Sequence, residues 1–324
     1  MKIHFLNVGH GDTTLVDFDG VYMLIDCKIS SKNDAAYKYI DKVIPKPQDK
    51  DAKKKLDYLV ITHPDKDHIT GLDIIDENFE IGEIWESGFR RSEDEEECAE
   101  YEIFLELIEK ITTKQLSAGS NKLSFPIDKV EAYCLCSKSN DDDDDIHYNS
   151  LVLKFVEGNK SIIFTGDSNC EAWKNKVVKY YKSLLDADIL HASHHGSRSF
   201  FFEEGQDKDE DEPYTDGLEA ISPVYTVISG CDSDDKEKED WPPHDDAVAL
   251  YEEYTSSDGG VYITGKDGNL VFELTGDEIK FDESDSKNYN VKRGRYQKYT
   301  GLKAPFRPGT GEPQGKITES SFGD

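Results

Sequence analysis

LDYLVITHPDKDH, residues 56–68, joins a short apolar run to a cluster of metal-binding side chains. The first seven residues are mostly apolar and partly β-branched, which predicts a buried strand. The next six carry four potential ligands: His63, Asp65, Asp67 and His68. Apolar spacing resumes at Ile69 and predicts a short helix that begins near Asp67. The pattern therefore predicts two pairs of ligands at a strand end, facing two adjacent cations.

Length and charge limit what the rest of the chain can be. Its 324 residues are enough to bury a large core in one α/β domain or two smaller ones. The net charge of −30 comes from 68 acidic and 38 basic residues. The acid is concentrated in residues 93–97, 141–145, 203–212 and 232–240, which are typical of solvated loops. Such a field repels a polyanion, so a nucleic-acid substrate requires metal ions or a local basic path.

Cysteine usage and hydropathy indicate the compartment. The six cysteines show neither a CxxC pair nor a regular framework, which favours reduced thiols. No run approaches 18 apolar residues, and the chain starts directly in an alternating strand. We therefore expect a cytoplasmic protein that makes no contact with membranes.

Hydrophobic periodicity predicts alternating strands and helices over most of the chain. Helices are expected over residues 35–44, 95–116, 170–185 and 245–254, and near Glu219. Strands are expected over residues 3–8, 13–18, 21–26, 56–62, 81–85, 123–125, 129–135, 150–156, 161–164, 189–192, 224–228, 260–264, 269–274 and 278–281. We expect one domain over residues 1–283 and an extended, partly basic tail over residues 284–324.

Two further segments place ligands at strand ends. SIIFTGD, residues 161–167, puts Asp167 just after a buried strand, where it is suited to bridge two cations, and Gly166 permits a tight turn. DILHASHHGS, residues 188–197, presents His194 and His195 in the same way. Imidazole and carboxylate ligands together suit Zn²⁺ or Mn²⁺ better than Ca²⁺, and Asp65 favours the harder Mn²⁺. Two cations about 3.5–4 Å apart activate a shared water for hydrolysis.

These motifs, in this order, resemble the metallo-β-lactamase-fold hydrolases. The chain is most similar to the hydrolase domain of ComEC-type competence proteins and their stand-alone relatives. The resemblance spans roughly residues 1–282 and rests on FLNVGHGD (5–12), LID (24–26), HPDKDH (63–68), NSLV (149–152), TGD (165–167), HHGS (194–197) and WPPH (241–244). It implies an α/β sandwich, the four-layer αββα fold, with two mixed β-sheets flanked by helices.

The resemblance also implies which residues bind metal. His63 and Asp65 bind one divalent cation, Asp67 and His68 bind the second, and Asp167 bridges them. Either His194 or His195 completes a ligand set, and the sequence leaves this choice open. We assign His194 to the metal and His195 to catalysis, where it contacts a substrate oxyanion.

Other positions have supporting roles by the same resemblance. Asn149 stands where many relatives have a third histidine, so it is expected near the ligands or the substrate. His147 is an alternative ligand, although its acidic neighbours favour a solvent-exposed position. Asp12 and Asp26 are expected to orient the ligands. His244 either binds substrate and protonates the leaving group or is an ordinary helix-start histidine.

The implied activity is that of a metal-dependent phosphodiesterase that acts on nucleic acid or a nucleotide, with Asp67, His195 and His244 as catalytic residues. A small diester, such as a phosphorylcholine ester, fits the acidic surface better than a long duplex does. The alternative class is a non-catalytic metal-binding subunit of a multi-protein system. Such a subunit is expected to bind a partner through its acidic surface or its basic tail.

Overall fold

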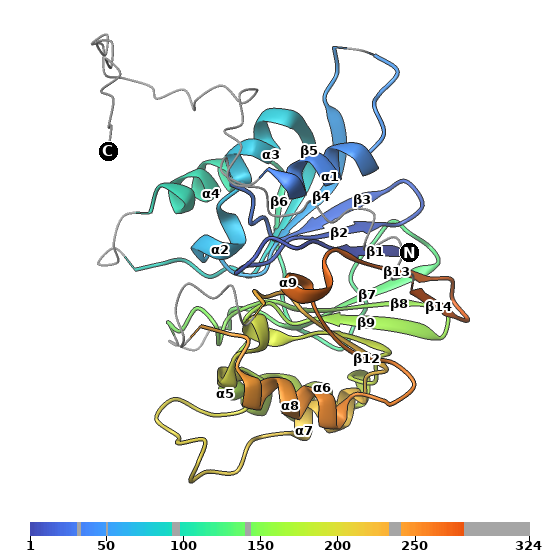
Figure 1. Cartoon of the computed structure of the whole chain (residues 1–324). Helices are drawn as coiled ribbons and strands as arrows, with labels where there is room; N and C mark the ends of the chain where they lie inside the picture. Colours follow the sequence, from blue (N-terminus) through green and yellow to red (C-terminus); the bar gives the residue numbers. More distant parts are fainter. Residues whose placement is uncertain (31–33, 50, 93–97, 140–143, 233–240, 282–324) are drawn as a thin grey trace, which may run out of the picture.

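The computed structural model describes residues 1–30, 34–49, 51–92, 98–139, 144–232 and 241–281. Two mixed β-sheets face each other, and a layer of helices covers the outer face of each (Figure 1). The expected four-layer αββα architecture is confirmed. The chain of residues 284–324, expected as an extended tail, lies outside the described residues.

The first sheet has eight strands in the order β14-β13-β1-β2-β3-β4-β5-β6. Strands β3 to β6 are parallel neighbours, while the pairings that involve β1, β2, β13 and β14 are antiparallel. The strands are β1 (Lys2–Phe5), β2 (Thr14–Asp17), β3 (Tyr22–Ile25), β4 (Lys54–Ile61), β5 (Phe79–Glu86), β6 (Thr113–Gln115), β13 (Leu270–Leu274) and β14 (Ile279–Phe281). Its outer helices are α1 (Ala35–Val43), α3 (Leu72–Asn78) and α4 (Ala99–Lys110).

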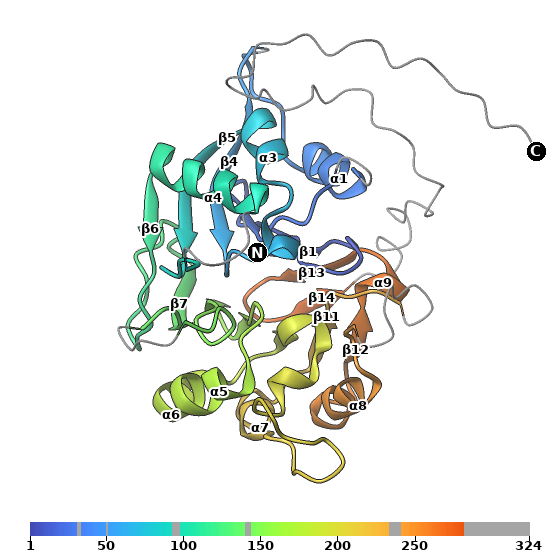
Figure 2. The ribbon, with the colours of Figure 1, turned by 90° about the vertical axis from the view of Figure 1, so that its left-hand side faces the viewer.

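The second sheet has six strands in the order β12-β11-β10-β9-β8-β7, of which β9 to β12 are parallel neighbours. They are β7 (Val130–Cys136), β8 (Val152–Glu157), β9 (Lys160–Phe164), β10 (Ile189–His191), β11 (Tyr225–Ile228) and β12 (Gly260–Ile263). Its outer face carries α5 (Cys170–Ala172), the π-helix η1 (Trp173–Val177), α6 (Val178–Tyr181), α7 (Asp216–Ile221) and α8 (Asp245–Tyr254), which form the lower layer in Figures 1 and 2. The short elements are η2 (Lys182–Leu184), η3 (Ser193–Gly196), η4 (Arg198–Phe200) and α9 (Thr264–Asp267).

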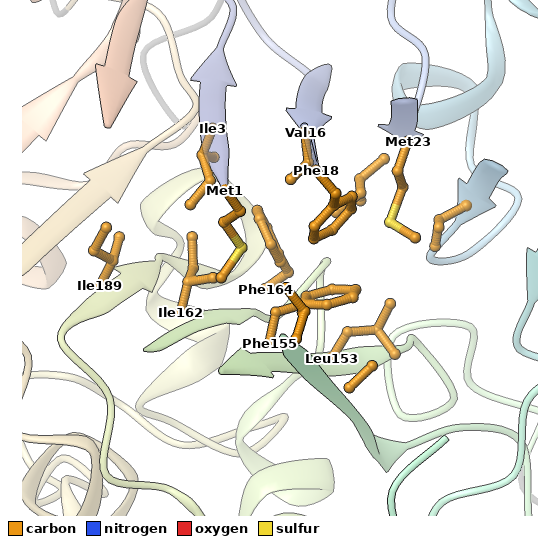
Figure 3. Close-up of a cluster of buried hydrophobic side chains, with 14 of the residues drawn as sticks. Met1, Ile3, Val16, Phe18, Met23, Leu153, Phe155, Ile162, Phe164 and Ile189 are labelled. Atoms are coloured by element: carbon orange, nitrogen blue, oxygen red, sulfur yellow. The ribbon is translucent and has the colours of Figure 1, made fainter. Parts of the chain in front are cut away.

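The main core lies between the two sheets. Figure 3 shows Phe18 from the end of β2 facing Phe155 on β8, and their ring centroids are 5.6 Å apart. The second half of β4, residues 58–61, is apolar because both of its faces are buried: Tyr58 and Val60 enter this core, whereas Leu59 packs under the outer helices. Each fully buried side chain of this kind stabilises the fold by roughly 1.5–3 kcal/mol.

Two sequence-based expectations differ from the structure. The helix expected over residues 95–116 is α4, which ends at Lys110, and the chain then forms β6 beside β5. The β-branched Thr112 and Thr113 follow the end of the helix, and pairing with β5 is the more favourable use of this segment. Residues 123–125 form no strand; a single backbone bond from Leu123 N to Ala132 O (2.7 Å) holds them against β7.

The direction of the strands brings distant loops together. Strands β3 and β4 are parallel neighbours, as are β9 and β10, so the chain leaves both strands of each pair at the same edge. The segments that follow β4, β9 and β10 carry the predicted ligands, and the segment that follows β3 carries Asp26, which is expected to orient them. Among the described residues, no helix is long and apolar enough to cross a membrane.

His4 on β1 makes the stability of the fold depend on pH. It is buried with Nδ1 2.8 Å from Tyr39 Oη, and burial, helped by nearby Lys2, lowers the pKa of His4 from 6.5 to about 4. The folded state therefore binds fewer protons than the unfolded chain between these values, so the free energy of unfolding decreases as the pH falls from 6.5 to about 4.

When the pH is lowered from 7 to 5, the free energy of unfolding should fall in both proteins. We expect it to fall by about 2 kcal/mol less in the His4→Gln variant than in the wild type. Urea unfolding at the two pH values measures this difference. The same pH dependence in both proteins contradicts the assignment.

Candidate metal centre

The predicted ligands meet at one end of the sandwich, where strands of both sheets end. His63 and Asp65 lie on the loop after β4, and the short helix α2 (Lys66–Ile69) carries the next two ligands, as the spacing predicts. The segment after β9 contributes Asp167, and η3, after β10, contributes two histidines. The set brought together by these elements is His63, Asp65, Asp67, His68, Asp167, His194 and His195.

Asp167 is the centre of the arrangement. Its carboxylate is buried and lies near the Nε2 atoms of four histidines. The N–O distances are 3.2 Å to His68, 3.5 Å to His195, 3.6 Å to His194 and 3.7 Å to His63. Burial by itself would raise the pKa of Asp167, but the surrounding imidazoles outweigh it and hold the pKa well below its usual value. The carboxylate is therefore ionised and faces these four histidines.

One group of ligand atoms surrounds His63. His63, His147 and Asp167 each offer an atom within 4.8 Å of the others. Asp65 Oδ2 lies 3.8 Å from His63 Nε2 and 3.5 Å from His147 Nε2. The Arg91 guanidinium donates to Asp65 Oδ1 at 2.7 Å, which fixes the carboxylate while leaving Oδ2 toward the histidines.

A second group lies on the other side of Asp167. His68 and His195 share it with Asp167, and His195 Nε2 is also 3.2 Å from Asp67 Oδ2. His10 Nε2 approaches the same Asp67 oxygen at 3.2 Å. Burial opposes ionisation of Asp67, but hydrogen bonds from His10 and His195 prevail and lower its pKa.

The Nδ1 atoms of the buried imidazoles point away from the centre and make hydrogen bonds on that outer side. His68 Nδ1 donates to Asp26 Oδ2 at 2.8 Å, and His195 Nδ1 donates to the Ser229 carbonyl at 2.9 Å. His63 Nδ1 lies 3.1 Å from Thr62 Oγ1, whose own proton goes to Asp26. With the proton on Nδ1, each Nε2 presents a lone pair to the centre, as in histidines that bind metals.

The unpaired polar atoms test whether cations fit here. Among the described residues, His63 Nε2, His68 Nε2, His195 Nε2 and Asp167 Oδ1 are buried and have no hydrogen-bond partner. Buried polar atoms without partners are rare and costly, and these four converge on one place. Three imidazole nitrogens and a shared carboxylate are the donor set that Zn²⁺ or Mn²⁺ takes. The residues therefore fit divalent cations on both sides of Asp167.

The backbone around the ligands is strained. His194 and His195 have φ of 47° and 56°, which places two consecutive non-glycine residues in the left-handed region. This conformation costs roughly 1–2 kcal/mol per residue. It turns the two rings to different sides of Asp167, and such strain is typical of functional sites.

Comparison with known proteins agrees with this architecture. Residues 6–114 match the Metallo-beta-lactamase superfamily. The chain has the metallo-β-lactamase fold. None of the curated proteins that were compared matches the chain.

Several solved structures are similar to this chain. Igni18, a metallo hydrolase from the archaeon Ignicoccus hospitalis, shares 15% identity over 85% of this chain and 100% of its own, with a TM-score of 0.47. Zn²⁺-bound PqqB from Methylobacterium extorquens shares 11% identity over 85% of this chain and 100% of its own, with a TM-score of 0.49. A diphosphatase from the PhnP family shares 13% identity over 87% and 100%, with a TM-score of 0.45.

Within this metallo-β-lactamase fold, the expected supporting carboxylates lie behind the ligands. Asp26 accepts hydrogen bonds from His68 and from Thr62 N (2.8 Å). Asp12 is buried 3.7 Å from His195 Nδ1 and 3.4 Å from His191 Nε2. Burial opposes its ionisation, but these two histidines lower the pKa of Asp12 to about 2. Both carboxylates therefore face the outer sides of the ligand rings.

The structure also places three residues for which the sequence left alternatives open, and His244 takes the helix-start position that was one of them. His147 was expected in solvent, but its side chain is only 27% exposed and joins the His63 group. Asn149 turns away from the centre: its Nδ2 donates to Asp145 O at 2.8 Å, and its Oδ1 accepts from Lys176 Nζ at 3.0 Å. His244 precedes α8, where its Nδ1 accepts from Arg198 N at 3.2 Å, and it belongs to none of the ligand groups found among the described residues.

Sequence reasoning did not assign His10 a role. It lies in the turn Gly9-His10-Gly11, next to Asp12, and its ring stacks on Trp241 with centroids 4.6 Å apart. Gly11 has φ of 126°, and a Cβ there would lie 2.5 Å from Asp67 O, so the turn packs directly against the helix that carries Asp67. The glycines on both sides of a histidine were the available signal.

Asp167→Asn should weaken the binding of both cations, because a neutral amide in this position does not balance their charge. We expect the affinity for Zn²⁺ or Mn²⁺ to fall at least about 100-fold at both sites. Titration calorimetry after chelator treatment measures this.

The wild type should also gain roughly 2.7 kcal/mol of unfolding free energy per site at 100 times the dissociation constant. The matched control is Asp186→Asn, whose side chain is exposed. Two bound cations in the Asp167→Asn variant would show that the centre is assigned incorrectly.

Proposed function

We propose that the protein is a ComEC-like phosphodiesterase that uses two divalent cations, Zn²⁺ or Mn²⁺, to hydrolyse nucleic acid or a nucleotide. The observation that carries the proposal is the sharing of one buried carboxylate, Asp167, by two separate groups of imidazole nitrogens. Asp65, in the place of a second histidine, supports the ComEC-like branch. The same sharing argues against a purely structural subunit, which does not require ligands converging from four loops.

Each residue has a role in this proposal. His63, Asp65 and His147 would hold one cation, Asp67, His68 and His195 would hold the other, and Asp167 is near both groups. Divalent cations bound there would supply an activated water and would offset the negative charge that develops in phosphodiester hydrolysis. The chain itself holds the ligands rigid through Asp26, Thr62 and the Ser229 carbonyl.

The roles of the histidine pair are exchanged relative to the sequence-based assignment. His195 has a fully buried side chain, and its Nδ1 faces a carbonyl that only accepts, so its Nε2 suits metal binding. His194 is 23% exposed, and its Nδ1 lies 2.8 Å from the Ser199 hydroxyl, which is able to donate. Burial above all lowers the pKa of His194 to about 4, so it is neutral at pH 7. We therefore assign His194 Nε2–H as a hydrogen-bond donor to a phosphate oxygen.

A cavity beside the centre bears on the choice of substrate. It has a volume of about 380 Å³ and lies next to His147 and Ser199. Four acidic residues line it, Asp145, Glu171, Glu203 and Glu204, and its one arginine, Arg198, is already paired with Asp246 at 2.6 Å. A negative lining disfavours a long polyanion next to the centre. This observation favours a second candidate substrate, a small phosphodiester with a neutral or cationic leaving group of the phosphorylcholine kind.

Hydrolysis of bis-p-nitrophenyl phosphate with Mn²⁺ or Zn²⁺ tests the activity. We expect Asp67→Ala and His68→Ala to lower kcat/KM at least about 100-fold, because each removes a contact that stabilises charge at the reacting centre. Asp186→Ala is the control that leaves the centre intact. Equal rates in the wild type and in both variants would exclude the proposed activity at this site.

A comparison of diesters under the same conditions separates the candidate substrates. A dinucleotide and a choline-containing phosphodiester are the informative pair. Faster hydrolysis of the dinucleotide supports the nucleic-acid assignment, and faster hydrolysis of the choline diester supports the small cationic substrate.

Substitutions of His194 and His195 should have different effects on metal content and on kcat. His195→Ala is expected to lose one of two cations, whereas His194→Ala is expected to keep both and to lower kcat by about 10²–10³-fold, the usual effect of removing one oxyanion donor. Metal content by mass spectrometry, measured together with kcat, distinguishes them. A His194→Ala protein that binds one cation would restore the original assignment.

A further inference from the structure

We propose that Lys176 is the positioning residue for His147, and that it thereby sets the affinity of the cation site that His63, Asp65, His147 and Asp167 form. This inference rests on the metal centre in the proposed function. It concerns a buried lysine on the outer helical layer, which touches none of the ligands itself.

The π-helix η1 interrupts the helical run from Cys170 to Tyr181. Within it, the Val178 N–H reaches Trp173 O, five residues earlier, in place of the usual four. Single π-turns of this kind occur frequently at functional sites. Lys176 in this turn is only 9% exposed, while Lys179 on the following turn is exposed. The turn therefore directs a charged side chain into the protein.

The Lys176 ammonium binds both ends of the segment between β7 and β8. It donates to Tyr148 O and Asn149 Oδ1, each at 3.0 Å, and to Ser137 O at 3.4 Å. It also lies 3.7 Å from the centroid of the Tyr148 ring. Three acceptors match the three protons of the ammonium, and the ring adds a cation–π contact. A buried charge is tolerated here because all of these partners are oxygen atoms or an electron-rich face.

The same contacts determine the shape of the turn that carries His147. Asp145 Oδ1 accepts from His147 N at 2.7 Å and from Tyr148 N at 3.0 Å. Asn149 closes the turn, since its Nδ2 donates to Asp145 O while its Oδ1 is held by Lys176. Both polar atoms of the Asn149 side chain are therefore hydrogen-bonded, and these bonds stabilise the turn.

This fastened turn presents the His147 ring to the metal centre. The ring lies 4.4 Å from that of His194 and 5.5 Å from that of His63, centroid to centroid, and its Nε2 is 3.5 Å from Asp65 Oδ2. Asn149 does not reach the centre, so His147 supplies the second imidazole of the group around His63. Without the ammonium, two carbonyls and an amide oxygen lose their shared donor. The turn then keeps its contact to the start of α5, where Asn169 Nδ2 donates to Asp145 Oδ2 at 3.0 Å, but loses the one that holds Tyr148 and Asn149.

Lys176→Met tests the proposal because it keeps the apolar stem and removes the charge. We expect titration of the metal-free protein with Zn²⁺, followed by calorimetry, to show one of two sites weakened by about 10–100-fold and the other unchanged. Lys179→Met, an exposed lysine of the adjoining turn, should bind both ions as the wild type does. Two sites of wild-type affinity in Lys176→Met would overturn the proposal.

A double-mutant cycle separates positioning from a general loss of stability. His147→Ala should weaken the same single site, and adding Lys176→Met to it should cause no further loss, because both changes remove one interaction. Additive losses would show that Lys176 acts by another route and would overturn the proposal. If Lys176→Met does not fold, Asn149→Ala replaces it in the cycle, since it opens the same turn while the ammonium keeps the Tyr148 and Ser137 carbonyls as acceptors.

The outcome is independent of the proposed activity. A wild type that binds two cations and cleaves no phosphodiester overturns the phosphodiesterase assignment alone, and the cycle still decides the role of Lys176. A wild type that binds fewer than two cations overturns the inference together with the centre on which it rests.

Discussion

The burial of the Asp167 carboxylate is the constraint on which the rest of the site depends. An ionised carboxylate inside a protein is stable only when positive or hydrogen-bonding groups surround it. Here four imidazole nitrogens lie within 3.7 Å, and they come from β4, α2 and β10. The parallel pairs β3–β4 and β9–β10 end at the same edge, which makes this convergence geometrically available. The strained turn at His194 and His195 is the local cost of directing two adjacent rings to it.

The imidazoles are held by contacts at Nδ1, which leave the Nε2 atom of each ring facing the centre. Asp26 fixes His68, the Ser229 carbonyl fixes His195, and Thr62 passes the same constraint from Asp26 to His63. A rigid set of nitrogens and one shared carboxylate is suited to bind two cations and to hydrolyse a substrate without a side-chain nucleophile. The net charge of −30 and the acidic cavity act in the opposite direction, because they limit how much negative charge a substrate brings. These two conditions are the reason for proposing a small diester as the second candidate substrate.

The loop between β7 and β8 divides two tasks between neighbouring residues of one turn. Here the side chain of Asn149 closes the turn from inside, and His147 occupies the side that faces Asp65 and His63. A buried lysine on a π-turn connects this loop to the helical layer, so the outer helices contribute to the geometry of the centre.

The amino-acid sequence by itself determined the parts that depend on local pattern. The apolar run before HPDKDH, the short helix at Asp67 and the carboxylate after β9 were predictable, because each depends on neighbours within a few residues. The tertiary structure alone decided which way side chains point once strands from distant segments meet. It placed His147 in the centre and turned Asn149 out, it buried His195 while leaving His194 partly exposed, and it brought His10 to Asp67. These choices depend on contacts between residues far apart in the chain, which local periodicity does not encode.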